Sequence, residues 1–406
     1  MSPKNLLLFS LPLIGSLFFA TPLIAAPVVA PNDEQKIRAG LVTQPKEPRL
    51  WNNLGVTLRR QGRLPEAIAA YRQAVSIDSR YADAYSNLAV ALAALQRYPE
   101  AFQAINQAIK LNRSNAVYHL NLATIDEGLK RYSEAAIEYQ TYLQRANDAA
   151  PVYARLARLQ TRLGRPAQAL ISWQKAVDVE PDNGEYRLAY GQALADASQN
   201  FAATAQLEAA IRLNAMDGRG YLLLGNLYLE QDQPDAGAAA LREAARLDPN
   251  SARIQNDLGV ALSNLKLDDE ALAALQKAVA LAPNYAEAYS NLGVLQRRRG
   301  KIQEAEAAYK KALAITDRLP QLYNNLGVLY LETNRDKEAV EQFDQALKRN
   351  ANYWEARRNL ALVLSRQGDL KGAAQQLQIV LSASIPATTV AEVQADLRRI
   401  QEANTR

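Results

Sequence analysis

The sequence contains no cysteine and only one histidine, His119, among its 406 residues. The lack of cysteine excludes disulfide scaffolds, thiol nucleophiles and cysteine metal sites. A single histidine leaves too few nitrogen ligands for the usual zinc sites. Glycine-rich phosphate loops, paired catalytic carboxylates and a serine elbow are also missing from the sequence. The sequence therefore predicts no enzyme, no cofactor, no metal site and no small-molecule substrate.

Aromatic residues and net charge are scarce as well. Aromatic residues make up 7% of the chain, and the formal net charge is only +5. Such a weak charge does not produce the dense positive field of a nucleic-acid-binding protein, so we expect no nucleic-acid partner. The chain instead has 49% hydrophobic and 22% charged residues and is rich in alanine, leucine, arginine and glutamine. This composition is typical of a folded, helical chain and not of a disordered one.

Charged residues are absent from most of the N-terminal segment. Lys4 is followed by an uncharged and largely apolar stretch over residues 5–32. This pattern predicts a secretory signal peptide or an N-terminal membrane anchor over residues 1–30. Ala30 fits the small residue of a cleavage site, but Pro31 follows it and disfavours cleavage, so a cleaved signal and an uncleaved anchor both stay open. We expect an exported protein that is periplasmic, otherwise extracytoplasmic, or anchored to a membrane.

A period of 34 residues runs through residues 48–387 without insertion or deletion and defines ten repeats. The period is easiest to follow at one leucine position. The leucines at this position are Leu54, Leu88, Leu122, Leu156, Leu224, Leu258, Leu292, Leu326 and Leu360. Only Tyr190 departs from the set. A fixed period of this length predicts a solenoid, in which each repeat buries its apolar face against its neighbours.

Each repeat contains two amphipathic segments joined by a tight turn. With Pro48 as position 1, apolar residues at spacings of three and four fill positions 4 to 11 and positions 20 to 27, which predicts two helices. Gly62 at position 15 suits the left-handed backbone of a helix end, and Asn334 can adopt the same conformation in its repeat. Positions 8 and 20 hold only glycine or alanine. Small residues at these facing positions predict a close approach of the two helices.

These residues together form a known pattern. The set Trp51, Leu54, Gly55, Ala67, Tyr71 and Ala74, with Pro181, Pro249 and Pro283 near the ends of repeats, resembles the tetratricopeptide repeat. The resemblance covers 340 of the 406 residues. It implies an all-α fold, a right-handed superhelical solenoid of antiparallel helix pairs with a concave groove. It also implies a protein or peptide partner as the usual ligand and no intrinsic catalysis.

The segments on either side of the repeats are expected to close the array. Residues 31–47 are expected to form a short helix and a linker. Residues 388–406 are expected to form a capping helix that begins at Thr388 or Thr389 and carries apolar residues along one face. These apolar residues are Val390, Val393, Leu397 and Ile400.

The resemblance implies that the first helix of each repeat faces the groove and that position 6 is one of the groove positions. Position 6 holds Asn53, Asn87, Asn121, Asn291, Asn325 and Asn359. Asparagine is a mediocre helix former, so its recurrence in mid-helix does not serve helix stability. Its amide both donates and accepts, which suits a row that holds an extended peptide backbone. The alternative interpretation is that these side chains are solvated and bind nothing.

Arginines form a second candidate site. Arg155, Arg158 and Arg162 lie at spacings of three and four, so they share one face of the first helix of repeat 4. Guanidinium groups bind carboxylates and phosphates in a bidentate manner. The alternative is a solvated surface balanced by acids such as Glu127.

Two further arginine pairs occupy positions 12 and 13 of repeats 1 and 8. They are Arg59 with Arg60 and Arg297 with Arg298. Acids stand at comparable positions in other repeats, at Glu127, Asp196, Glu230 and Glu332. For these two pairs, a solvated surface balanced by acids is the favoured interpretation.

The sequence thus favours an exported or membrane-anchored scaffold that binds an extended peptide or a partner domain in the groove. One alternative is an assembly or secretion factor for a membrane or envelope complex, such as a polysaccharide export machinery. A second is the targeting subunit of a separate glycosyltransferase, because one sugar-transferase family carries a similar asparagine-lined array. Only 19 residues follow the tenth repeat, which is too few for a catalytic domain.

Overall fold

The computed structural model describes residues 33–146 and 149–404, which form 22 helices and contain no strand. The helices are α1 (Asp33–Thr43), α2 (Pro48–Arg60), α3 (Leu64–Ile77), α4 (Ala82–Ala94), α5 (Tyr98–Leu111), α6 (Ala116–Gly128), α7 (Tyr132–Leu143), α8 (Ala150–Arg162), α9 (Pro166–Val179), α10 (Gly184–Asp196), α11 (Asn200–Arg212), α12 (Gly218–Glu230), α13 (Pro234–Leu247), α14 (Ala252–Asn264), α15 (Asp268–Leu281), α16 (Ala286–Arg298), α17 (Ile302–Ile315), α18 (Pro320–Glu332), α19 (Asp336–Arg349), α20 (Trp354–Arg366), α21 (Leu370–Ser382) and α22 (Ala387–Asn404). The segment over residues 1–30, for which the sequence predicts a signal or an anchor, lies outside the described residues.

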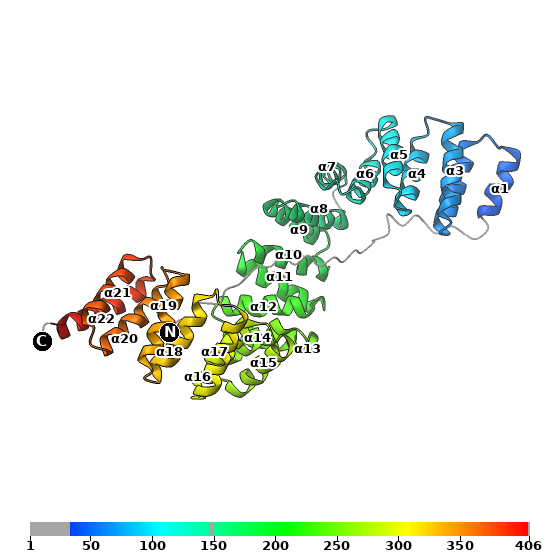
Figure 1. The fold of residues 1–406 in the computed structure, drawn as a ribbon. Helices are drawn as coiled ribbons and strands as arrows, with labels where there is room; N and C mark the ends of the chain where they lie inside the picture. Colours follow the sequence, from blue (N-terminus) through cyan, green and yellow to red (C-terminus); the bar gives the residue numbers. More distant parts are fainter. Residues whose placement is uncertain (1–32, 147–148, 405–406) are drawn as a thin grey trace. The chain divides into compact units, whose positions relative to one another are not determined.

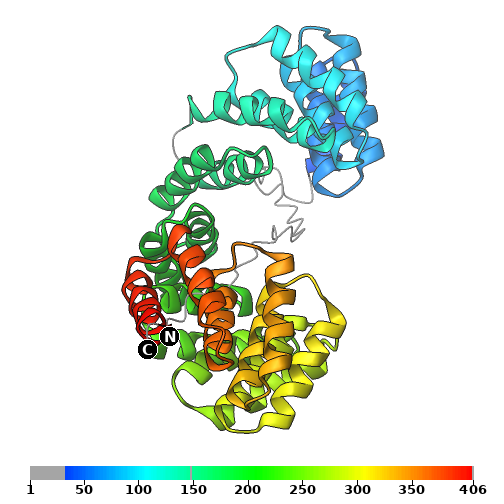
Figure 2. The same cartoon turned by 60° about the vertical axis from the view of Figure 1, so that its left-hand side comes forward.

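The helices belong to two compact units, Met1–Arg165 with α1 to α8 and Pro166–Arg406 with α9 to α22 (Figure 1). Within each unit, every helix packs against the next one along the chain, and the first helices of adjacent repeats also touch. A second view shows this stacking for the C-terminal helices, drawn in orange and red (Figure 2). The all-α solenoid of helix pairs that the period predicts is confirmed.

All ten helix pairs are joined by the same turn. Its residue at position 15 has φ between 58° and 86°, in the left-handed region. The N–H of the next residue donates to a carbonyl five residues back, as from Arg63 to Leu58 at 2.9 Å, which closes the end of the first helix. The left-handed turn predicted at Gly62 and Asn334 is confirmed, and other residues adopt it as well. These are Gln96, Lys130, Ser198, Asp232 and Lys266.

The close approach predicted at position 8 is confirmed. A Cβ atom added at Gly55 would lie 2.5 Å from Cε1 of Tyr71, and one added at Gly293 would lie 2.6 Å from the same atom of Tyr309. Both tyrosines stand at position 24 and are fully buried. Glycine at position 8 therefore makes room for the large side chain that fills the core between the two helices.

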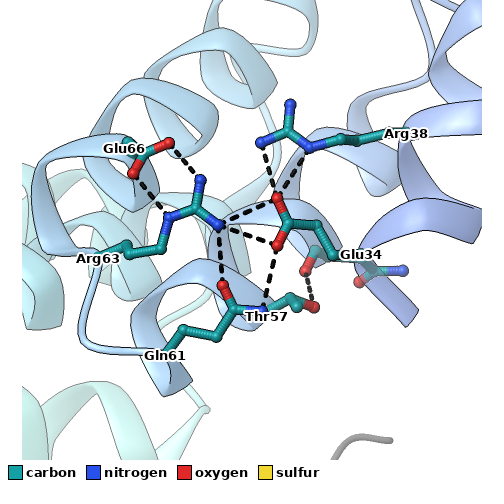
Figure 3. A network of polar contacts seen from close by, with 7 residues as sticks. Glu34, Arg38, Thr57, Gln61, Arg63 and Glu66 are labelled. Atoms are coloured by element: carbon teal, nitrogen blue, oxygen red, sulfur yellow. Dashed lines mark hydrogen bonds and ion pairs between the residues drawn. The ribbon is translucent and has the colours of Figure 1, made fainter. Parts of the chain in front are cut away.

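Helix α1 closes the N-terminal end of the repeats and continues their period. It ends at Thr43, which lies 34 residues before Ile77, the last residue of α3. Glu34 on α1 accepts a hydrogen bond from Arg38 at 2.8 Å and forms an ion pair of 2.9 Å with Arg63 in the turn of repeat 1 (Figure 3). Helix α1 thus has the register of the second helix of a further repeat.

Helix α22 covers the last repeat, as the sequence predicts. Val393 is fully buried and Ile400 is 8% exposed, both against α21 and its neighbours. Arg358 of α20 binds Asp396 at 2.9 Å and Glu392 at 2.8 Å. The helix begins at Ala387, so the threonines expected as its cap lie inside its first turn.

Candidate functional site

The structure places all six predicted asparagines on the first helices of their repeats. In the N-terminal unit, Asn53, Asn87 and Asn121 lie on α2, α4 and α6, which contact one another in that order. In the C-terminal unit, α16, α18 and α20 are also successive neighbours. They carry Asn291, Asn325 and Asn359. Each unit therefore contains its own row of three amides, and the two rows are described separately.

Five of these asparagines connect neighbouring repeats. In the N-terminal unit, the side-chain N–H of Asn87 donates to Asn52 at 2.9 Å, and that of Asn121 donates to Ser86 at 3.0 Å. In the C-terminal unit, the corresponding bonds run from Asn291 to Asn256 at 2.9 Å, from Asn325 to Ser290 at 3.3 Å and from Asn359 to Asn324 at 2.9 Å. In every case position 6 donates to position 5 of the preceding repeat. We call these bonds the amide clasps.

The clasps use only part of each amide. The side chains of Asn87, Asn291, Asn325 and Asn359 are half-buried, and within the part of the chain that the structure describes no donor reaches their Oδ1 atoms. Each also keeps a second N–H. Asn121 is more enclosed, at 6% exposure, whereas Asn53 is exposed. The clasp fixes the direction of each amide while leaving an acceptor and a donor available to a ligand.

Both rows end where position 6 changes. In the C-terminal unit this position holds Ala189, Leu223 and then Asp257. Asp257 is 9% exposed and accepts hydrogen bonds from Asn256 at 2.9 Å and from Asn226 at 3.5 Å. Burial raises the pKa of Asp257, and these amide bonds act against that rise. Along the C-terminal unit, position 6 therefore holds apolar residues in the repeats before Asp257 and asparagines in the repeats after it.

The predicted arginine face is engaged within the protein. Arg155 forms an ion pair of 3.0 Å with Glu127, a residue at position 12 of the preceding repeat, and Glu127 also accepts a bond from the hydroxyl of Tyr139. The guanidinium of Arg162 lies over the ring of Tyr132, 4.0 Å from its centre. Arg158 is exposed on the same helix, α8. The ion pair of Arg155 with Glu127 agrees with the alternative interpretation of this face, in which nearby acids balance the arginine charges.

Both ring nitrogens of His119 contact other residues of the protein. Its Nδ1 atom lies 2.6 Å from a carboxylate oxygen of Glu138 on α7, and its Nε2 atom lies 3.2 Å from the carbonyl oxygen of Arg113. It therefore joins the two helices of repeat 3 to the preceding loop. Across the described residues, no group of three or more histidine, cysteine or acidic side chains is arranged to hold a metal ion. None of the helices in residues 33–146 and 149–404 combines the length and the apolar character needed to cross a membrane.

The clasp acceptors at position 5 are the residues that sequence reasoning missed. They are Asn52, Ser86, Asn256, Ser290 and Asn324. The sequence does contain a signal for them, because a polar residue stands at position 5 whenever the next repeat has asparagine at position 6. Where the next repeat has another residue at position 6, position 5 is Leu120, Ala154, Leu188 or Leu222. The two positions therefore change together at a spacing of 35 residues.

Comparison with family models identifies the repeat. One model described as TPR repeat matches residues 55–96. Models described as tetratricopeptide repeat match residues 82–115, 218–251, 250–318 and 324–387. Together these matches cover more than half of the chain, and the chain belongs to the tetratricopeptide repeat family. It is accordingly a protein–protein interaction scaffold, on a repeat fold that is typically non-catalytic.

Three solved structures illustrate the similarity to known chains. YrrB, a TPR protein with an unusual peptide-binding site, is 22% identical over 45% of this chain and 93% of its own, with a TM-score of 0.42. PilF of Pseudomonas aeruginosa is 21% identical over 55% of this chain and 96% of its own, with a TM-score of 0.43. Yeast Tom70 is 15% identical over 89% of this chain and 97% of its own, with a TM-score of 0.39. No curated protein matches the sequence.

Proposed function

We propose that this scaffold binds an extended peptide segment of a partner protein along the first helices of its repeats. The observation that carries this proposal is the row of amides fixed by the clasps, each with an acceptor and a donor left over. Neighbouring helices lie roughly 10 Å apart, and an extended chain advances about 3.3 Å per residue. A row of this spacing meets every third peptide group of the ligand, so it reads the backbone and tolerates many side chains.

Asn325 and its clasp partner Ser290 allow this function to be tested against a purely structural role. Asn325→Ala removes both the clasp and the half-buried amide, whereas Ser290→Ala breaks the clasp but keeps the amide. We expect Asn325→Ala to weaken a phage-selected peptide ligand by about three- to tenfold, the worth of about one hydrogen bond. We expect Ser290→Ala to change the affinity much less. Fluorescence anisotropy with the labelled peptide measures both.

The triple variant Asn291→Ala, Asn325→Ala and Asn359→Ala extends the test to the whole C-terminal row. Its expected loss of affinity is tenfold or more, because three hydrogen bonds are removed together. Helical content by circular dichroism serves as the control for folding. Equal losses for Ser290→Ala and Asn325→Ala would show that the asparagines act only through the clasps, and the peptide proposal would then be rejected.

The proposed place of action is outside the cytoplasm, at or beyond a membrane, where the scaffold positions its partner. This part of the proposal is supported by the uncharged, largely apolar sequence over residues 5–32. N-terminal sequencing of the protein recovered from membrane and soluble fractions tests it. An N-terminus near residue 27 or 31 indicates a secreted protein, and an intact N-terminus in the membrane fraction indicates an anchor. An intact chain found only in the cytoplasm would contradict both.

A further inference from the structure

Repeats 1 and 8 share a residue set that no other repeat has. Both carry glycine at position 8, arginine at positions 12 and 13 and tyrosine at position 24. In repeat 1 these residues are Gly55, Arg59, Arg60 and Tyr71, and in repeat 8 they are Gly293, Arg297, Arg298 and Tyr309. The packing is the same in both repeats, since each tyrosine ring lies against its glycine. The chain therefore contains two copies of one local arrangement, which can be compared directly.

In repeat 8 both arginines are neutralised by acids of neighbouring repeats. Arg297 forms an ion pair of 2.5 Å with Glu332, a residue at position 13 of repeat 9. Arg298 binds the carboxylate of Asp268 and donates to the carbonyl oxygen of Ser263 at 2.7 Å, both in repeat 7. This copy shows which ligand the arginine pair accepts, namely a carboxylate presented from beside the helix.

In repeat 1 the corresponding acid is missing. Ala94 stands at position 13 of repeat 2, where Glu332 stands in repeat 9, and Ala94 is exposed. Among the described residues, neither Arg59 nor Arg60 has an ion-pair partner, and their Nε atoms are buried without a hydrogen bond. Burying such a donor without a partner costs stability. A carboxylate would pair the guanidinium charge through its terminal nitrogens, as Glu332 does at Nη1 of Arg297.

Glu66, the acid closest to the pair in sequence, and Glu100 of repeat 2 are occupied elsewhere. Glu66 binds Arg63 at 2.5 Å, and Glu100 binds Arg97 at 2.6 Å. The setting of the arginines is otherwise matched. Burial raises the pKa of Tyr71, with the charge of Arg59 acting against the rise, and burial raises the pKa of Tyr309 to about 12, with the charge of Arg297 acting in the same way. Arg59 and Arg297 thus each lie beside the hydroxyl of a tyrosine, and they differ in the residue at position 13 of the next repeat, which is Ala94 or Glu332.

We propose that Arg59 and Arg60 form a carboxylate-binding site for a partner protein, in which the partner's carboxylate takes the place that Glu332 takes on Arg297. The proposal rests on the function proposed above, because it assumes a protein ligand. The carboxylate comes from an aspartate or glutamate side chain or from a C-terminus. The site adds a charged anchor at the N-terminal end of a surface that otherwise holds a peptide by its backbone.

The two copies provide the variants for the test. Ala94→Glu supplies the missing carboxylate within the chain and should occupy the site of repeat 1. Glu332→Ala removes the internal carboxylate and should open the site of repeat 8. Ala307→Glu makes the same change in net charge as Ala94→Glu at an exposed position of α17, a second helix, whereas both arginine pairs are on first helices, and it serves as the control.

Three fluorescent ten-residue peptides serve as probes of the full chain in anisotropy titrations. They are an amidated Gly–Glu repeat, an amidated Gly–Gln repeat and a Gly–Gln repeat with a free C-terminal carboxylate. We expect one of the two carboxylate-bearing peptides to bind at least tenfold more tightly than the amidated Gly–Gln peptide. The preferred peptide shows whether the source is a side chain or a C-terminus. We expect Ala94→Glu to remove this preference, Ala307→Glu to retain it and Glu332→Ala to raise the stoichiometry from one to two.

A measurement without any ligand checks the geometry separately. Ala94→Glu should raise the melting temperature of the wild-type chain but not of the Arg59→Gln variant, because the gain requires the guanidinium. Equal binding of all three peptides, or a preference that Ala94→Glu leaves unchanged, would overturn the proposal. The three peptides differ only in their carboxylates, so this result would reject the carboxylate site alone. The proposal that the amide row binds a peptide is tested separately by Asn325→Ala.

Discussion

Asp126, on α6 of repeat 3, is a carboxyl group enclosed in the core. It is 1% exposed, and its Oδ1 atom has no hydrogen-bond partner among the described residues. Burial raises the pKa of Asp126 to about 6, and the charge of Arg131, whose Nε atom lies 3.4 Å away, acts against the rise. At neutral pH the group is therefore charged in a place that disfavours charge. Its contribution to stability must depend on pH.

The variant Asp126→Asn should be more stable than the wild type at pH 8 and close to it at pH 4. The pKa of about 6 in the fold lies above the ordinary value of 3.8, so the folded chain holds the proton more tightly than the unfolded chain. The stability that this proton provides is present below about pH 4 and is lost as the pH rises through 6. Asparagine stays neutral throughout, and we expect a gain on the order of 1 kcal/mol at pH 8.

Melting temperatures from pH 4 to pH 8 measure this difference. Asp257→Asn serves as a comparison, because amide donors already satisfy that carboxylate and its gain should be smaller. Arg131 keeps other contacts in the Asp126 variant, since its guanidinium also lies over the ring of Phe102. A melting-temperature difference that does not change with pH would contradict this account of Asp126.

At the scale of the element, the turn at position 15 shows how far a repeat tolerates an unfavourable residue. All ten turns use a left-handed backbone, but only four have glycine there. For other residues this conformation costs roughly 1–2 kcal/mol. The remaining repeats accept the cost because the turn closes the first helix and sets the second helix antiparallel to it. A substitution at this position can therefore raise the free energy of unfolding without changing the packing of the helices.

Lys266→Gly should stabilise the chain by about 1 kcal/mol, after the greater flexibility of glycine in the unfolded chain is deducted. Lys266 is exposed and has a φ of 64°, so its side chain can be removed with little loss of contact. Denaturant unfolding of the variant measures the gain. The opposite change, Gly300→Ala, should cost a similar amount at the same position of the next repeat. A loss of stability in Lys266→Gly would mean that the lysine side chain makes a contribution of its own.

Sequence reasoning reached the helix pairs, their small facing residues and the row of asparagines, because all of these repeat with the period. It did not reach the amide clasps, because these join position 6 to position 5 of the preceding repeat. The packed helices show the offset of one residue between adjacent first helices, and the sequence contains it only as the joint change of positions 5 and 6 at a spacing of 35 residues. Sequence reasoning also did not distinguish Arg59 from Arg297. The residue that distinguishes them lies in the next repeat and is Ala94 for Arg59 and Glu332 for Arg297.

At the scale of the whole molecule, the N-terminal end of the array uses the same contacts as an interior repeat. Glu34 of α1 binds Arg38 and Arg63, and Arg63 binds Glu66. Eight repeats later, the same positions hold Glu306, Lys310, Arg335 and Glu338, joined by the same ion pairs. The second network lies in the interior of the C-terminal unit. The two form a natural pair for asking how far a local loss spreads along a solenoid.

Glu34→Gln and Glu306→Gln should differ in how many neighbouring helices lose amide protection. In a solenoid each repeat is stabilised only by its neighbours, so Glu34→Gln should raise amide exchange in α1 to α3 alone. Glu306→Gln should raise exchange in α17 to α19 and in the helices on both sides. Hydrogen exchange followed by mass spectrometry resolves these segments.

Acidification provides an independent check of the same contacts. Burial alone would raise the pKa of Glu306, but hydrogen bonds from Lys310, Arg335 and Tyr330 outweigh it and lower the pKa to about 2. The stability that Glu306 contributes is therefore complete above its ordinary pKa of 4.5 and is lost as the pH falls toward 2. The hydrogen bonds from Arg38 and Gln61 likewise lower the pKa of Glu34. Lowering the pH from 6 to 3 should reduce amide protection in the wild type near both networks, when each exchange rate is compared with the intrinsic rate at the same pH. The reduction should be smaller in each variant near its own site. A rise in exchange along all of α9 to α22 in Glu306→Gln would instead mean that this unit opens as a single body, and that its stability is not a sum over neighbouring repeats.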